Sequence, residues 1–306
     1  MASPEVFMFP GQGSPHVGMG QRLETSVAAQ DVYAEADEIL STHSWKRSVR
    51  DICLTGPKEY LNNTEIAQPI ILTVSVAAYK DLINSGNAAD AVVGHSLGEY
   101  AALVAAGSMT FRDAIGAVAQ RGRLMKLAGE DRPGAMVAVL GLELTKVESL
   151  CARLVEQTPD AIVQVANING PGQIIISGDR AAFQNVTDYA KELGAKAVFN
   201  LPVTIAGHSE LMRSIAKDME QVIDSISLAF PVIPFYSPTT GLRVTEPREI
   251  KALLVAQLTS RVEWVDTILS MKRDGYRSFH EVGPGKVLSR LVHDIDSSVE
   301  VSATNS

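Results

Sequence analysis

The chain has 306 residues, of which 46% are hydrophobic and 20% charged, as in a globular protein with a substantial core. Its 27 basic and 35 acidic residues give a formal net charge of −8, which disfavours a general nucleic-acid binder, because such proteins usually present a basic face. No run approaches the ~18 apolar residues of a membrane span, and the N-terminus lacks a signal-peptide pattern. We therefore expect a cytoplasmic protein that binds neither nucleic acid nor a membrane.

The two cysteines, Cys53 and Cys151, are too few for a disulfide framework and have no Cys or His neighbours at metal-ligand spacing. We expect both to be free thiols in a reducing compartment. We also expect no metal and no other bound cofactor.

Short apolar runs alternate with helical patterns along the first 130 residues, which is typical of an α/β protein. The pattern predicts strands at 6–9 and 91–93. The predicted helices lie at 69–83, 97–106 and 111–128, and a glycine follows each of them closely.

A different order begins after residues 130–134, which we interpret as a linker. Strand, helix, strand, strand, helix and strand are predicted at 135–140, 144–157, 162–168, 173–177, 180–193 and 195–201. This βαββαβ order is typical of a ferredoxin-like fold. The α/β pattern then resumes, with strands near 232–235 and 278–282 and helices from about 209, after 247, near 264 and after 285. We therefore expect a ferredoxin-like α+β domain at 131–201, inserted into a large α/β domain formed by 1–130 and 202–306.

The strongest local signal is a G-x-S-x-G element at 94–98, between a predicted strand and a predicted helix. Glycines at both ends relieve clashes in so sharp a turn, and Ser96 then projects at the head of the helix. Unpaired N–H groups there, that of Leu97 among them, suit a developing oxyanion. The element predicts a nucleophilic serine in a domain of α/β-hydrolase type; the alternative is a chance glycine-flanked turn.

A second Gly-His-Ser, at 207–209, lacks the second glycine, and we interpret Ser209 as the start of a helix. His208 follows the strand-like segment 201–205 and is the candidate general base for Ser96. The alternative is a structural role, the more frequent one for a lone histidine. His95, next to the candidate nucleophile, is expected to support the turn.

Arg121 lies in the centre of an apolar stripe on the helix predicted at 111–128. An inward guanidinium needs an anionic partner, because an unpaired buried charge is costly. The partner is either a carboxylate of the chain or the carboxylate of a substrate held by two parallel hydrogen bonds; snorkelling is a further alternative. The apolar members of the stripe are Ala114, Ala117, Val118, Met125 and Ala128.

Taken together, these residues belong to ordered blocks that resemble the malonyl-CoA:acyl-carrier-protein transacylase family, which includes discrete acyltransferases of trans-acting polyketide synthase systems. The blocks run nearly from end to end. They are FPGQGS (9–14), GHSLGEYAALVAAG (94–107), QRGRLM (120–125), GAM (134–136), ANINGPGQIIISG (166–178), GHSELM (207–212), QLTSRVEW (257–264) and EVGPGKVL (281–288).

The resemblance implies a ping-pong acyl transfer in fatty acid or polyketide biosynthesis. A malonyl or related carboxyacyl group would pass from coenzyme A to Ser96, with His208 as base, and then to the phosphopantetheine thiol of an acyl carrier protein. Coenzyme A thioester enters as substrate, not as a resident cofactor.

The resemblance also implies roles for five further residues. Gln12 and the N–H of Leu97 would form the oxyanion hole, and Arg121 would pair with the malonyl carboxylate. Asn167 would lie near the cleft between the two domains, and the backbone carbonyl of Gln257 would orient His208.

The chain departs from the family pattern at Ala206-Gly207-His208. Many malonyl-selective polyketide members resemble A-F-H there, and methylmalonyl-selective members often have serine in the middle position. Glycine removes bulk beside the acyl pocket, so a larger extender unit is an alternative substrate. An acyl hydrolase acting on carrier proteins is an alternative activity, and a non-catalytic carrier-protein-binding module is a third reading.

Overall fold

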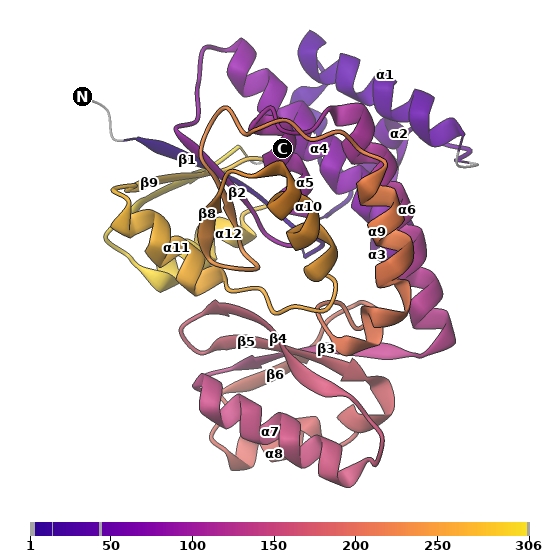
Figure 1. The fold of residues 1–306 in the computed structure, drawn as a ribbon, viewed down its shortest axis with the longest axis vertical. Coiled ribbons are helices and arrows are strands. Elements are labelled where there is room, and N and C mark those ends of the chain that lie inside the picture. Colours follow the sequence, from indigo (N-terminus) through magenta and orange to yellow (C-terminus); the bar gives the residue numbers. More distant parts are fainter. Residues whose placement is uncertain (1–3, 14, 43–44, 305–306) are drawn as a thin grey trace.

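The computed structural model describes residues 4–13, 15–42 and 45–304; Ser14 of the FPGQGS block lies outside them. Two sheets organise this part of the chain, a six-stranded sheet in the upper body of Figure 1 and a four-stranded sheet below it. The fold is a mixed α/β fold, as the sequence predicts.

The six-stranded sheet has the order β10-β9-β1-β2-β7-β8, and every neighbouring pair except β7 and β8 is parallel. Successive side chains of β1 point to opposite faces: Phe7 and Phe9 enter one hydrophobic cluster, and Val6 and Met8 enter another. Both faces are therefore buried, which is why the strands read as continuous apolar runs. The strands are β1 (Glu5–Phe9), β2 (Ala91–Gly94), β7 (Phe235–Ser237), β8 (Leu242–Val244), β9 (Ser278–Glu281) and β10 (Glu300–Ala303).

Helices cover the two faces of this sheet unequally. Two helices, α11 (Trp264–Arg273) and α12 (Val287–Ile295), pack on the face of Val6 and Met8. The other face carries α1 (Val27–Ser41), α2 (Val49–Thr55), α3 (Lys58–Asn62), α4 (Thr64–Asn84), α5 (Gly98–Ala105), α6 (Phe111–Asp131), α9 (Ala216–Asp224) and α10 (Pro247–Ala256), with short 3-10 turns at Gln21–Leu23 and Glu210–Ile215.

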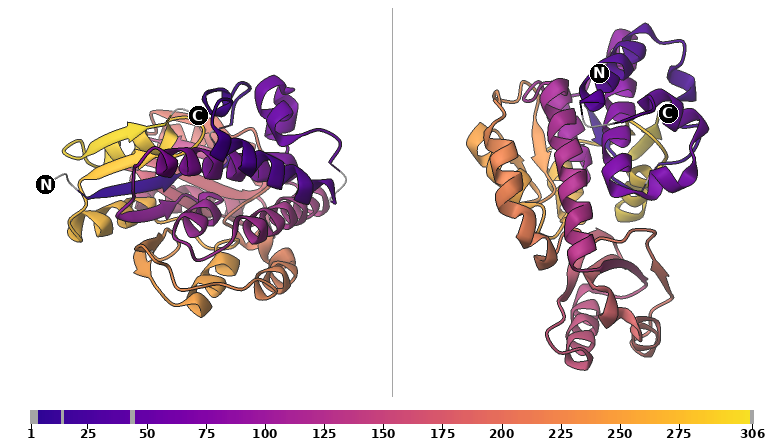
Figure 2. Two further views of the ribbon diagram at one scale, coloured as in Figure 1. Left: turned by 90° about the horizontal axis from the view of Figure 1, so that it is seen from above. Right: turned by 90° about the vertical axis from the view of Figure 1, so that its right-hand side faces the viewer.

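The four-stranded sheet is antiparallel and has the order β4-β5-β3-β6. Its two helices lie on the face turned away from the large sheet (Figure 1). The long helix α6 leads down to this sheet and runs almost directly into β3 (Figure 2, right). The elements are β3 (Gly134–Leu140), α7 (Leu144–Gln157), β4 (Val163–Gly170), β5 (Gln173–Asp179), a 3-10 turn (Arg180–Phe183), α8 (Val186–Glu192) and β6 (Ala197–Asn200).

Several predicted boundaries are wrong. The linker expected at 130–134 is reduced to two residues between α6 and β3, and the helix expected at 180–193 is split into a 3-10 turn and α8. Residues 201–205 do not form a strand, and the strand expected near 232–235 begins only at Phe235. The helix α4 begins five residues before the predicted position, because Asn63 caps it by accepting a hydrogen bond from the N–H of Glu65.

In the described part of the chain one helix, α4, is long and apolar enough to span a membrane by length and composition alone. Of its apolar window, 67% is buried inside the protein, as expected for a helix that packs in a core.

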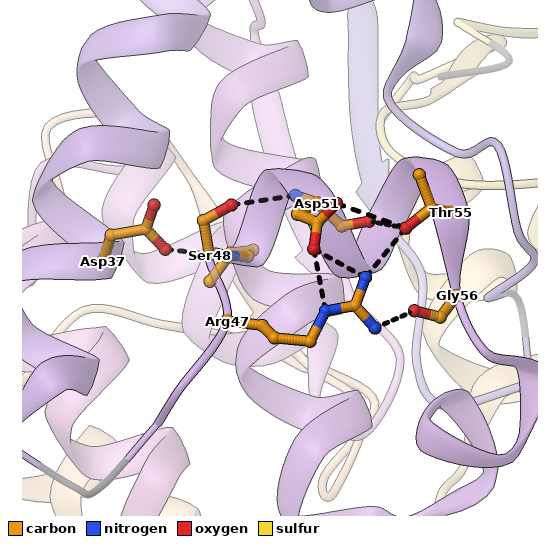
Figure 3. Close-up of polar contacts among 7 residues, drawn as sticks. Asp37, Arg47, Ser48, Asp51, Thr55 and Gly56 are labelled. Atoms are coloured by element: carbon orange, nitrogen blue, oxygen red, sulfur yellow. Dashed lines mark hydrogen bonds and ion pairs between the residues drawn. The ribbon is translucent and has the colours of Figure 1, made fainter.

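The short helix α2, which no sequence pattern predicts, is held by polar contacts at both ends (Figure 3). The hydroxyl of Ser48 accepts from the N–H of Asp51 at 3.0 Å. Arg47 donates to Asp51 Oδ2 at 2.7 Å, to Thr55 Oγ1 at 2.8 Å and to the carbonyl of Gly56 at 2.5 Å. A helix of seven residues depends on such contacts and on packing, because its intrinsic stability in water is negligible.

Candidate active site

The candidate nucleophile lies in a tight turn at the carboxyl end of β2. Ser96 has a φ of 53°, in the left-handed region, and a Cβ at Gly94 would lie 2.0 Å from the carbonyl carbon and oxygen of Gly98. A Cβ at Gly98 would in turn lie 2.0 Å from the carbonyl oxygen of Phe9, at the end of β1. The turn therefore forms only because both flanking residues are glycine, which is the reason that the sequence pattern suggests.

Ser96 and His208 are in direct contact although 112 positions separate them in the sequence. Ser96 Oγ lies 2.7 Å from His208 Nε2. The other ring nitrogen, Nδ1, donates to the carbonyls of Gln257 at 2.8 Å and Ser260 at 3.2 Å. Because Nδ1 faces only acceptors, it carries the proton, and Nε2 is left to accept from the serine hydroxyl.

His208 is buried and is held in its neutral form. Burial, reinforced by the nearby Arg121 guanidinium, lowers the pKa of His208 to about 3. A neutral imidazole bonded to a hydroxyl is the protonation state that a general base requires.

Arg121 lies beside this pair and is 2% exposed, as the apolar stripe predicts. Its Nη1 donates to Gln68 Oε1 at 2.7 Å and its Nη2 to Gln257 Oε1 at 2.9 Å, while Ser96 Oγ lies 3.4 Å from Nη2. The guanidinium therefore rests on two neutral amides, and among the described residues it forms no ion pair with a carboxylate. Its Nε has no hydrogen-bond partner among them either.

Two further residues of this network are not predicted from the sequence. Gln68 lies on α4, and Glu99 lies in the first turn of α5, three residues after Ser96. Glu99 is 1% exposed and accepts hydrogen bonds from Ser237 Oγ at 2.7 Å and from Gln257 Nε2. Burial raises the pKa of this carboxyl to about 7. The signal in the sequence that could have identified Glu99 is an acidic residue directly after the G-x-S-x-G element.

A cavity of about 370 Å³ opens over the pair and brings together most of the predicted site residues. Asn167 lines it from a bulge in β4, and Leu97 lines it from the turn. The side chain of Gln12 donates to Thr64 Oγ1 at 2.8 Å. Gln257 does not line the cavity: it is fully buried behind Arg121 and His208. The described residues that line the cavity include Gln12, Ser96, Leu97, Arg121, Met125, Met136, Asn167, Gly207 and His208.

His95 links the turn to the small sheet. Its Nε2 lies 2.8 Å from Asn169 Oδ1 on β4, and its ring packs edge-on against Trp264 with centroids 5.3 Å apart. This contact is the supporting role that the sequence suggests for His95.

The cavity contains a hydroxyl hydrogen-bonded to a neutral imidazole, with a buried guanidinium beside them. Such an arrangement defines a protein class that transfers acyl groups through serine. The chain belongs to the acyl transferase domain family, whose model matches residues 6–304.

Among curated relatives, the malonyl CoA-acyl carrier protein transacylase of Bacillus subtilis is 38% identical over 301 residues, covering 98% of this chain and 93% of the relative. The Escherichia coli K12 transacylase is 36% identical over 302 residues, covering 98% and 95%.

Solved structures agree with these relatives. The malonyl CoA-acyl carrier protein transacylase of Coxiella burnetii superposes with a TM-score of 0.94 at 33% identity, covering 100% of this chain and 95% of that one. A malonyl-transacylase solved in complex with a type II polyketide synthase acyl-carrier protein gives a TM-score of 0.93 at 33% identity, covering 99% and 96%.

Proposed function

We propose that this protein transfers a malonyl group from coenzyme A to the phosphopantetheine thiol of an acyl carrier protein. The observation that carries the proposal is the 2.7 Å contact between Ser96 Oγ and His208 Nε2. Beside it lies Arg121, which forms no ion pair with any carboxylate of the described residues. The names of the curated relatives and the carrier-protein complex of a solved neighbour support it.

The chemistry proceeds in two half-reactions. Ser96 Oγ attacks the thioester carbonyl as its proton passes to His208 Nε2, the C–S bond breaks, and the proton leaves with the coenzyme A thiol. The carrier thiol then attacks the acyl-serine ester with His208 as its base, and the serine oxygen recovers the proton. Gln257, through its backbone carbonyl, keeps the proton of His208 on Nδ1 throughout.

The main-chain N–H groups of Gln12 and Leu97 are the proposed oxyanion donors. The side-chain amide of Gln12 is engaged by Thr64, which supports a role for its backbone instead. Asn167, at the cavity wall, would contact the bound acyl chain. The serine and imidazole supply both nucleophile and proton carrier, so the proposed reaction needs no resident cofactor and coenzyme A thioester enters as substrate.

Arg121 would hold the malonyl carboxylate by a charge-assisted pair. The negative charge would also offset the effect of the guanidinium on the pKa of His208 and so make the base stronger when the correct substrate is bound. An acyl hydrolase that clears neutral acyl groups gains nothing from such a cation, which favours transfer over the alternative of hydrolysis.

A larger extender unit remains the alternative substrate because of Gly207. A Cβ at this position would meet Ile205 Cδ1 at 3.3 Å and Met125 Cε at 3.4 Å, so the ends of these two flexible side chains fill the space beside Gly207. The flexible ends of these side chains are the atoms that a bulkier acyl group would displace.

We further propose that the described sheets correspond to a large α/β-hydrolase-like domain, 1–130 and 202–306, and an inserted ferredoxin-like domain, 131–201. The strand order β4-β5-β3-β6, with α7 and α8 on one face, supports the second assignment. A cytoplasmic location is supported by the two buried free thiols, which suit a reducing compartment. A role in fatty acid or polyketide biosynthesis is supported by the names of the curated relatives and of the solved neighbour.

Intact-protein mass spectrometry tests the proposed reaction. Incubation with malonyl-CoA should add one malonyl group to the protein, and later addition of a holo carrier protein should move that group to the carrier. Ser96→Ala should give no adduct. An adduct that survives this substitution, or one that water removes as fast in the absence of the carrier as in its presence, would contradict the proposal.

Arg121→Ala tests the substrate. Loss of the charge-assisted pair should lower kcat/KM for malonyl-CoA by about 30- to 900-fold, equivalent to about 2–4 kcal/mol, and raise activity toward acetyl-CoA relative to malonyl-CoA. Arg123→Ala, an exposed position two residues along the same helix, is the matched control and should leave the ratio unchanged. A preference for ethylmalonyl-CoA over malonyl-CoA in the unaltered protein would favour the larger substrate.

A further inference from the structure

Glu99 is a buried carboxylate that the proposed reaction does not use. Its Oε1 accepts from Ser237 Oγ on β7, and its Oε2 accepts from Gln257 Nε2 at the end of α10. Glu99 is 1% exposed, and burying a carboxylate costs free energy unless hydrogen bonds replace the lost hydration. Its position next to the reactive serine therefore needs a reason.

The contact with Glu99 decides which way the side-chain amide of Gln257 points. An amide has donors on one side and an acceptor on the other. Gln257 Nε2 donates to Glu99 and to the carbonyl of Ser96 at 3.1 Å, and this leaves Oε1 to accept from Arg121 Nη2 at 2.9 Å. Rotated by half a turn, the amide would set N–H against N–H at Arg121 and oxygen against oxygen at Glu99.

The bridge also keeps the two charges apart. Glu99 reaches Arg121 only through the amide of Gln257, so above pH 7, where this carboxyl is mostly ionised, its negative charge balances the guanidinium without contacting it. A carboxylate in direct contact would occupy the guanidinium fork and compete with any anionic ligand. Hydrogen bonds in a buried chain polarise one another, and this strengthens the bond between Gln257 and Arg121.

We propose that Glu99 is a positioning residue for carboxylate selection: through Gln257 it holds Arg121 in place for the acidic end of the acyl group without itself pairing with the guanidinium. This inference rests on the proposed function, because it assigns the specificity of the same site.

Glu99→Gln tests the proposal, because it keeps the shape of the side chain but removes the negative charge. It also replaces a group that only accepts hydrogen bonds with one that both donates and accepts. The ratio of kcat/KM for malonyl-CoA to that for acetyl-CoA should fall at least tenfold, chiefly through a higher KM for malonyl-CoA, while acetyl transfer changes less than threefold. Glu281→Gln is the matched control. Glu281 is also fully buried, but it accepts from the N–H groups of Leu288 and Ser289 at the start of α12, and its replacement should leave the ratio unchanged.

A ratio of the two kcat/KM values that stays unchanged, because both fall equally or neither falls, would overturn the positioning role. A raised ratio would overturn it as well. If Glu99→Gln does not fold, Glu99→Asp retains the charge but withdraws it from Gln257 by one methylene, and the same fall in ratio is expected. Malonylation of the unaltered protein is measured alongside: its absence would overturn the proposed function itself, whereas its presence with an unchanged ratio would overturn only the role of Glu99.

Discussion

Ser96 and His208 both adopt left-handed backbone conformations, with φ of 53° and 59°. Each such residue costs of order 1–3 kcal/mol unless its surroundings enforce it. At Ser96 the enforcing contacts are the glycine pair around the turn, and at His208 they are the two carbonyls that hold the ring. The strain therefore aims the hydroxyl and the imidazole at each other before any substrate binds.

The low pKa of His208 has a measurable consequence. Because burial lowers this pKa from 6.5 to about 3, the imidazole stays neutral as the pH falls through 6.5 and becomes protonated only near pH 3. The reaction of Ser96 with a neutral fluorophosphonate should therefore be nearly constant between pH 8 and pH 5. A histidine with an ordinary pKa would slow the reaction about thirty-fold over the same interval, and a fall of that size would contradict the assignment.

At the scale of elements, the site depends on how closely β1, β2 and α5 approach one another. The carbonyl of Phe9 also accepts from the N–H of His95 at 2.9 Å, so the end of β1 touches the turn through backbone atoms. No side chain fits between them, which makes Gly94 and Gly98 requirements of packing as well as of conformation.

Gly98→Ala should destabilise the protein by about 2–3 kcal/mol or more, because the new methyl group would meet main-chain atoms that cannot move aside. Gly116→Ala is the matched control: within α6, a Cβ there has no atom within 4 Å, and alanine should stabilise the helix by about 0.5–1 kcal/mol. Urea unfolding compares the two, and similar midpoints would refute this account of the turn.

At the scale of the whole molecule, the cavity exists because the small sheet is held over the carboxyl ends of the large one. Besides His95 and Asn169, the edge of β4 pairs with Val262, through Ile168 N–H to the carbonyl of Val262 at 2.9 Å and Val262 N–H to the carbonyl of Ala166 at 2.8 Å. The same segment continues from Gln257, so the strand that carries Asn167 and the residue that orients His208 are fixed to each other.

Asn169→Ala should leave the half-buried ring of His95 without its partner and lower the free energy of unfolding by about 1–2 kcal/mol. The preference for malonyl over acetyl groups should stay unchanged, because Arg121 and its partners are not touched. Asn200→Ala, at an exposed position on β6, serves as the control and should alter neither quantity. Denaturant unfolding and the two acyl-transfer rates measure both effects, and a shifted preference would show that the two sheets jointly set specificity.

Local patterns were sufficient for much of the architecture and for the nucleophile. Ser96 is predictable because glycine spacing, strand and helix are all encoded within a dozen residues, and Arg121 is conspicuous because helical periodicity reveals its inward direction. Helices α1, α2 and α3 escaped prediction, and so did the short strands β8 and β10. In α2 the reason is visible, since contacts with Arg47 and with the core replace strong periodicity.

Long-range contacts decided the rest. The base was one of six histidines until folding brought His208 to Ser96 across 112 positions, and the partner of Arg121 stayed open between a carboxylate of the chain and one of the substrate. In the tertiary structure Arg121 donates to the side-chain amides of Gln68 and Gln257. Gln257 in turn donates to Glu99, which lies 158 positions away in the sequence. Hydrogen bonds between distant segments depend on how whole sheets and helices pack, and no periodicity along a single segment encodes that geometry.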